Sequence, residues 1–366
     1  MPDQRGYTLI EVMIAITAGL LVIVSGFTIM NTTEKASSAT TKIADAQQNA
    51  RVAMELISRD LRMAGFGMKA PVGNCASAIV PNDKVPGGAD NGPDSIQLVV
   101  PAMSADPSLW KLAAAVLPPA STNATQNTIT LQANAVAGAG VTFPAVVSIG
   151  GAWSGTVNSA TGDVLTVAPT NLISRPFTFP VGTQVYWLQC ITYQVIPPPD
   201  ANNVCAGRAP CLARGVTTDA TNFCNVAASP CVPVVDGIED IQFAYACDGC
   251  ITTINSGIPN GVIDDQGTTN LNVFDAGDFI TNSSWAAGSP PLDPSKIRLV
   301  QINIVAREVQ AEQGLGEAPT TVTMVSGPLQ VSDHLHSADP GYNAGVYQQF
   351  RRRQLAKTIE TRNLGL

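Results

Sequence analysis

The sequence predicts an α+β fold in which one long N-terminal helix packs on an antiparallel β-sheet head. Residues 7–64 contain no proline, which favours one nearly continuous helix about 85 Å long. Beyond this helix, short segments rich in β-branched residues alternate with stretches of Gly, Pro, Ser, Thr and Asn. That second pattern is typical of strands joined by turns.

Composition narrows the class of function. The chain has 366 residues, of which 13% are charged, and its formal net charge is −8. Nucleic-acid binding requires a clustered basic surface, so this balance argues against a nucleic-acid partner. The sequence contains no P-loop, GxSxG elbow, HExxH motif or dinucleotide fingerprint. We therefore expect a nonenzymatic protein without a cofactor.

The first half of the helix, residues 7–30, is expected to span a membrane. No charged residue lies between Val12 and Met30, and residues 7–30 cover about 35 Å. A secretory signal has its cleavage site after the apolar region, whereas the plausible processing point here, Gly6–Tyr7, precedes it. The positive-inside rule, applied to Arg5, places residues 1–6 in the cytoplasm and the head beyond the inner membrane.

Glu11 lies near the start of this apolar segment. A carboxylate there is costly in lipid and indicates a partner charge. No cation lies one turn away within the helix, so the partner is expected to be another molecule or the amine created by cleavage after Gly6. A glutamate that merely extends to the membrane interface is the alternative, and it fits less well with the surrounding residues.

The segment from Arg5 to Val12 resembles the type IV prepilin signature: a basic leader, glycine, an aromatic residue, then apolar residues with glutamate fifth. This resemblance implies a prepilin peptidase that cleaves after Gly6 and methylates the new amine of Tyr7. It also implies that Glu11 attracts the N-terminal amine of a neighbouring subunit during assembly. Phenylalanine is the usual first mature residue, so Tyr7 is a mild departure that should still be processed.

Further stretches resemble the PilW family of type IV pilus minor pilins. They are residues 51–67, 212–215, 235–242 and 350–363. This resemblance implies a type IV pilin-like fold and a priming complex with other minor pilins and the major pilin. It also implies contact with the inner-membrane assembly platform, and roles in twitching motility and adhesion.

The second half of the helix, residues 31–66, is amphipathic and is expected to pack on the protein's own sheet. Its apolar side chains recur at spacings of three and four residues, at Ala39, Ile43, Ala46, Ala50, Ala53, Ile57, Leu61 and Ala64. Gly65, Gly67 and Pro71 are expected to end the helix. Residues 67–366 then form the β-rich head, with an insertion at about 95–190 that the resemblance hardly reaches.

The eight cysteines are expected to form disulfides in an oxidising compartment. They are Cys75, Cys190, Cys205, Cys211, Cys224, Cys231, Cys247 and Cys250. The neighbours Cys205 and Cys211, Cys224 and Cys231, and Cys247 and Cys250 are natural candidates for local pairs, although spacing alone does not determine the connectivity. Zinc bound by the CxxC of Cys247 and Cys250 is the competing interpretation, and it lacks a second CxxC.

Two other metal hypotheses are weaker, and we expect no metal. Asp264, Asp265, Asp275 and Asp278 form a calcium candidate set. Aligned to an EF-hand glycine turn, however, the surrounding loop lacks the required ligands. His334 and His336 could face the same side of a strand, but the nearby sequence shows no further ligand, so a loop position is favoured.

The sequence therefore predicts a minor pilin that starts or caps a type IV pilus. It would reside first in the bacterial inner membrane and then in the pilus at the cell surface. The nearest alternative is a minor pseudopilin of type II secretion, which shares the leader, the glutamate and the long helix. A membrane-anchored β-rich adhesin or other binding domain is the alternative from a different class.

Overall fold

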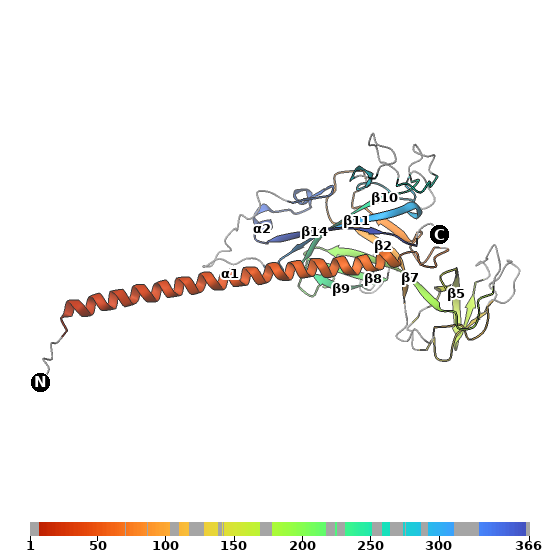
Figure 1. Cartoon of the computed structure of the whole chain (residues 1–366), viewed down its shortest axis with the longest axis horizontal. Helices are drawn as coiled ribbons and strands as arrows, with labels where there is room; N and C mark the ends of the chain where they lie inside the picture. Colours follow the sequence, from red (N-terminus) through yellow and green to blue (C-terminus); the bar gives the residue numbers. More distant parts are fainter. Residues whose placement is uncertain are drawn as a thin grey trace.

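The computed structural model describes most of the chain and shows a long helix, half of which projects beyond a β-rich head (Figure 1). The described residues are 7–69, 71–85, 87–102, 110–116, 128–137, 141, 143–168, 178–216, 224, 231–250, 258–263, 274, 276–286, 292–310 and 329–363. The head lies along the C-terminal half of the helix, as the sequence predicts.

Helix α1 (Leu9–Met63) is continuous over 55 residues. Burial begins only at Ala46, where the apolar stripe first meets the head. The helix ends where Gly65 adopts a φ of 76°, a conformation that glycine tolerates, and donates its backbone N–H to the carbonyl of Val99 at 2.9 Å. The amphipathic half therefore packs on the protein's own sheets, and the first half does not.

Within the described residues, the head contains one nine-stranded sheet and one three-stranded sheet, both antiparallel. The larger comprises β1 (Ile79–Asn82), β2 (Ser95–Ala102), β3 (Thr128–Thr130), β4 (Ala145–Ile149), β5 (Trp153–Thr161), β6 (Val164–Val167), β7 (Val185–Ile196), β8 (Cys211–Val216) and β9 (Cys231–Asp236). Its order is β1-β2-β7-β4-β5-β6-β3, and β8 and β9 extend from β7.

The three-stranded sheet has the order β10-β11-β14, with β10 (Ile238–Cys247), β11 (Ile297–Arg307) and β14 (Arg352–Glu360). The short elements are β12 (Gln330–Val331), β13 (His334–Leu335), the helix α2 (Ala344–Tyr347) and the 3-10 turns η2 (Ala276–Asp278), η3 (Pro294–Lys296) and η4 (His336–Ala338). Strands β12 and β13 form a hairpin of their own.

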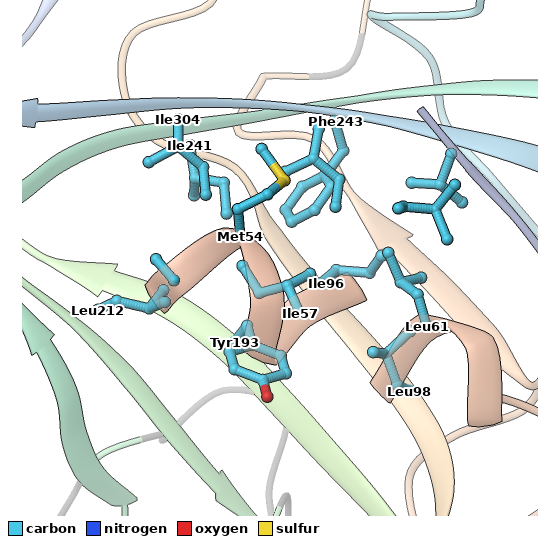
Figure 2. Packing of buried hydrophobic residues seen from close by; sticks show 14 of the residues in the cluster. Met54, Ile57, Leu61, Ile96, Leu98, Tyr193, Leu212, Ile241, Phe243 and Ile304 are labelled. Carbon is cyan, nitrogen blue, oxygen red and sulfur yellow. The ribbon is translucent and has the colours of Figure 1, made fainter. Parts of the chain in front are cut away.

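The main core lies where α1 meets both sheets. Figure 2 shows Met54, Ile57 and Leu61 of the helix among side chains of β2, β7 and β8 and side chains of β10 and β11. Ile57 and Leu61 have no exposed surface. Because one helix face covers strands from two sheets, the helix holds the head together and the head fixes the direction in which α1 projects.

A second core lies within the predicted insertion, and Figure 1 shows its strand β5 beyond the C-terminal end of α1. This core runs from Trp110 to Val185 and includes residues of β4, β5 and β6. Strand β2, at the start of the predicted range 95–190, instead contributes Ile96 and Leu98 to the main core. The second core therefore involves a shorter stretch of the chain than the predicted insertion at about 95–190.

Replacing Ile57 with alanine is expected to reduce the free energy of unfolding by about 3 kcal/mol, because it leaves a cavity between helix and sheets. Alanine is the better helix former, so the loss would report packing rather than helix propensity. Urea unfolding of the full chain in detergent measures it. Val52→Ala, at a side chain 41% exposed on the same helix, is the matched control and should change stability by less than about 0.5 kcal/mol. Equal effects of the two changes would contradict the packing account.

Candidate assembly interface

The N-terminal end of α1 is closed by a capping box formed by Thr8 and Glu11. The Thr8 hydroxyl accepts from the Glu11 backbone N–H at 3.4 Å, and the Glu11 carboxylate accepts from the Thr8 backbone N–H at 3.0 Å. Two backbone donors that a helix start leaves unsatisfied are thereby paired. The Glu11 carboxylate is thus directed back along the helix to Thr8, the residue that follows Tyr7.

The first half of α1 has no partner within the described chain. Every residue from Tyr7 to Met30 is exposed, including Leu9, Leu21 and Phe27. Helix α1 is the one described helix long and apolar enough to cross a membrane. A helix that is apolar all round and uncovered by its own head requires lipid or other apolar helices around it.

A buried polar network fixes the second half of α1 to the head. Asp60 of the helix accepts from the Tyr193 hydroxyl of β7 at 2.7 Å and from the Arg214 guanidinium of β8 at 3.0 Å. Burial, together with the negative charge of Asp60, raises the pKa of Tyr193, so this hydroxyl stays protonated and donates. The network joins the helix to two neighbouring strands and thereby sets the angle at which α1 leaves the head.

Replacing Tyr193 with phenylalanine is expected to lower stability by about 1.5 kcal/mol, because it removes a buried hydrogen bond to a carboxylate and keeps the ring. Thermal or urea unfolding measures the change. Tyr186→Phe is the control, since that ring packs edge-on against Phe66 at 5.0 Å and its hydroxyl is outside the network. A Tyr193→Phe variant as stable as the control would show that the network contributes nothing measurable.

The stretches that resemble one family are scattered in sequence and meet in space. Asp60 of residues 51–67 pairs with Arg214 of residues 212–215. Glu239 of residues 235–242 pairs with Arg352 of residues 350–363. Asn363 at the end of that last stretch donates to the Arg62 carbonyl of the first at 3.0 Å. No local sequence pattern indicates these pairings, because the partners are separated by more than a hundred residues. The first and third contacts hold the helix on the head, and the second joins β10 to β14 within the head.

All eight cysteines are paired in four disulfides. Three pairs are the sequence neighbours, Cys205–Cys211, Cys224–Cys231 and Cys247–Cys250. The fourth, Cys75–Cys190, joins the segment after α1 to strand β7 across 115 residues. The CxxC of Cys247 and Cys250 is therefore occupied by a disulfide instead of zinc.

Some of the remaining predicted site residues lie within the described part of the chain, and others lie outside it. Gly6 lies outside the described residues, and Tyr7 is 88% exposed at their start. Of the calcium candidates, Asp264, Asp265 and Asp275 lie outside the described residues, and Asp278 is buried in η2. The favoured loop position for the two histidines is wrong for His334, which lies in β13 and is buried, as His336 is in η4.

A long N-terminal helix, apolar in its first half and packed by its second half on an antiparallel β-sheet head, defines a type IV pilin-like protein. Family models identify the chain further. The model described as Type IV Pilus-assembly protein W matches residues 202–363, and the model of the prokaryotic N-terminal methylation motif matches residues 1–28. The C-terminal part of the chain thus matches the PilW family of type IV pilus-assembly proteins, and its N-terminus matches the methylation motif of type IV pilins.

Among solved structures, the type IV-like pilin TTHA1219 from Thermus thermophilus is similar to this chain. The two share 11% identity with a TM-score of 0.33, over 87% of this chain and 98% of that one. No curated protein sequence matches the chain.

Proposed function

We propose that this protein is a minor pilin that takes part in starting or capping a type IV pilus, with other minor pilins and the major pilin as its direct partners. The observation that carries the proposal is the division of α1. Its first half is exposed on all sides, whereas its second half is fixed to a head with two cores. Such a chain presents one helix to a helical bundle and one head to the outside.

Processing and orientation form part of the proposal. Residues 1–6 stay in the cytoplasm, a prepilin peptidase cleaves between Gly6 and Tyr7, and the new amine of Tyr7 is methylated. The match of residues 1–28 to the methylation motif supports this sequence of events. The four disulfides support a periplasmic head, because disulfides persist in oxidising compartments.

Assembly follows from the same geometry. As α1 leaves the membrane, with the inner-membrane platform supplying the movement, its exposed apolar half packs against the corresponding helices of other pilins. Glu11 then pairs with the methylated amine of a neighbouring subunit. The capping box supports this role, because it already holds the carboxylate at the end of the helix where that amine would arrive.

A position at the pilus tip is favoured over a repeating position in the shaft. The second core extends the head beyond the C-terminal end of α1 (Figure 1), which would crowd a filament that carried it on every subunit. A tip or priming subunit avoids this crowding. We propose roles in twitching motility and adhesion as consequences of pilus assembly, and no enzymatic activity.

A deletion strain tests the proposal against the type II secretion alternative. The expected result is loss of surface pili and twitching with normal secretion of type II substrates, both restored by the wild-type gene. Quantitative mass spectrometry of sheared pili should also find the protein far below the major pilin. Normal piliation with defective secretion would contradict the proposal and favour a pseudopilin. Normal piliation with lost adhesion would favour a membrane-anchored adhesin.

A further inference from the structure

We propose that Asp240, His334 and His336 form a binding site for a divalent transition-metal ion, with zinc as the ion they suit best. Asp240 comes from β10, His334 from β13 and His336 from the start of η4. All three side chains are buried, and one ligand atom from each lies within 4.8 Å of the other two. Two imidazoles and one carboxylate are a common ligand set for zinc.

The spacing of the ligand atoms suits a single ion. Asp240 Oδ2 lies 2.9 Å from His334 Nδ1 and 3.8 Å from His336 Nε2. Ligands about 2.1 Å from a tetrahedral zinc are about 3.4 Å from one another, and the two observed distances fall on either side of that value. The imidazole rings lie 4.8 Å apart, so both can present a nitrogen to the same point.

Each ligand residue is also held by a second contact through its other polar atom. His334 Nε2 lies 2.6 Å from the Asp339 carboxylate, His336 Nδ1 lies 3.0 Å from the Leu329 carbonyl, and Asp240 Oδ1 accepts from Gln242 at 3.0 Å. A carboxylate or carbonyl on the far nitrogen is the usual partner of a metal-binding histidine, because it fixes the tautomer and orients the lone pair. This pattern leaves His334 Nδ1 and His336 Nε2 directed towards Asp240.

Ion pairs without a metal would account for His334 but not for His336. His334 lies between the carboxylates of Asp240 and Asp339, so both of its ring nitrogens have partners without an ion. His336 remains unexplained, because its Nε2 atom is buried and has no hydrogen-bond partner among the described residues. A metal ion at this position would satisfy that nitrogen.

The surroundings also favour a cation. The Asp90 carboxylate is 4% exposed, and in the part of the chain that the structure describes neither of its oxygens has a hydrogen-bond partner. It lies close enough to His334 and Asp240 to interact with their charges. Thiolates do not compete for the ion, since all eight cysteines are in disulfides. Zinc bound here would tie the β12–β13 hairpin to β10 of the main core.

Metal content and thermal stability of the purified full chain in detergent, without a polyhistidine tag, test the proposal. The chain has only two histidines, both in the site, so no other imidazole confuses the readout. We expect one zinc per chain after equilibration and dialysis, and a melting temperature raised by about 5 °C at a zinc concentration 100 times the dissociation constant. His336→Gln should abolish both effects.

Tyr347→Phe is the matched control, because the Tyr347 ring lies 5.7 Å from His336 while its hydroxyl accepts from the Leu329 N–H and binds no ligand residue. This variant should keep the zinc. X-ray absorption of the wild-type chain needs no variant and should show nitrogen and oxygen ligands at about 2.1 Å with no sulfur. Absence of bound zinc in the wild type, or equal zinc in His336→Gln, would overturn the proposal. A melting shift with calcium alone would overturn it too, because calcium selects oxygen ligands.

Discussion

Replacing Glu11 with glutamine is expected to remove the protein from sheared pili while leaving its cleavage and its amount in the membrane unchanged. The change deletes one charge and keeps the shape of the side chain. Opposite charges about 4 Å apart attract by about 4 kcal/mol at an effective dielectric constant of 20, and an unpaired amine in lipid adds a further penalty. A loss of about 3 kcal/mol already corresponds to more than a hundredfold in association, so incorporation should fall at least tenfold.

Thr8→Ala separates this charge effect from the helix cap. Thr8 supplies the hydroxyl of the capping box, and its removal weakens the helix start by about 1 kcal/mol without altering the Glu11 charge. Immunoblots of sheared and membrane fractions should therefore show near-normal incorporation of Thr8→Ala. If both variants were lost equally from pili, Glu11 would act only through the cap. If Glu11→Gln were incorporated normally, the intermolecular pairing would be wrong.

Removal of the Cys75–Cys190 disulfide by double alanine substitution is expected to lower the free energy of unfolding by about 4–5 kcal/mol. This bridge closes a loop of 115 residues, and the entropy that a cross-link removes from the unfolded chain grows with loop length. Both sulfurs are buried against Val72, Val99 and Leu188, so the substitution also weakens a small apolar core. Urea unfolding of the oxidised full chain in detergent measures the loss.

The Cys224–Cys231 pair provides the matched comparison. It closes a loop of only seven residues, for which the same relation gives about 2 kcal/mol. The account therefore predicts that the long-range pair contributes roughly twice as much as the local one. The reverse order, or equal losses, would show that chain entropy does not govern the contribution of these bridges.

The sequence predicted the elements of the fold well, because their signals are local. The proline-free stretch and the spacing of Ala46, Ala50 and Ile57 indicate a helix and its buried face, and the structure confirms both. The segments near residues 95–100, 184–196 and 296–306 are rich in β-branched residues, a local signal for strands, and they form β2, β7 and β11. Patterns with a period of two residues for strands, or about 3.6 for helices, are visible within a short stretch of sequence.

The contacts between these elements were not predictable in the same way. The proposed metal site requires Asp240 beside His334, 94 residues away, and no period in the sequence reports that distance. The His334-x-His336 spacing is visible in the sequence, but the residues near it in sequence include no third ligand. The Asp60–Tyr193–Arg214 network likewise joins three segments that are far apart in sequence, so no local pattern indicates it. The packing of α1 and of the β12–β13 hairpin against the sheets brings these groups together.

The mature N-terminus tests the central claim most directly. Mass spectrometry should be applied to the protein recovered from the membrane fraction and from sheared pili. The account predicts a chain that lacks residues 1–6, begins with N-methylated Tyr7 and is present in both fractions. An intact Met1, or a cleavage site C-terminal to the apolar segment of α1, would contradict processing as a pilin.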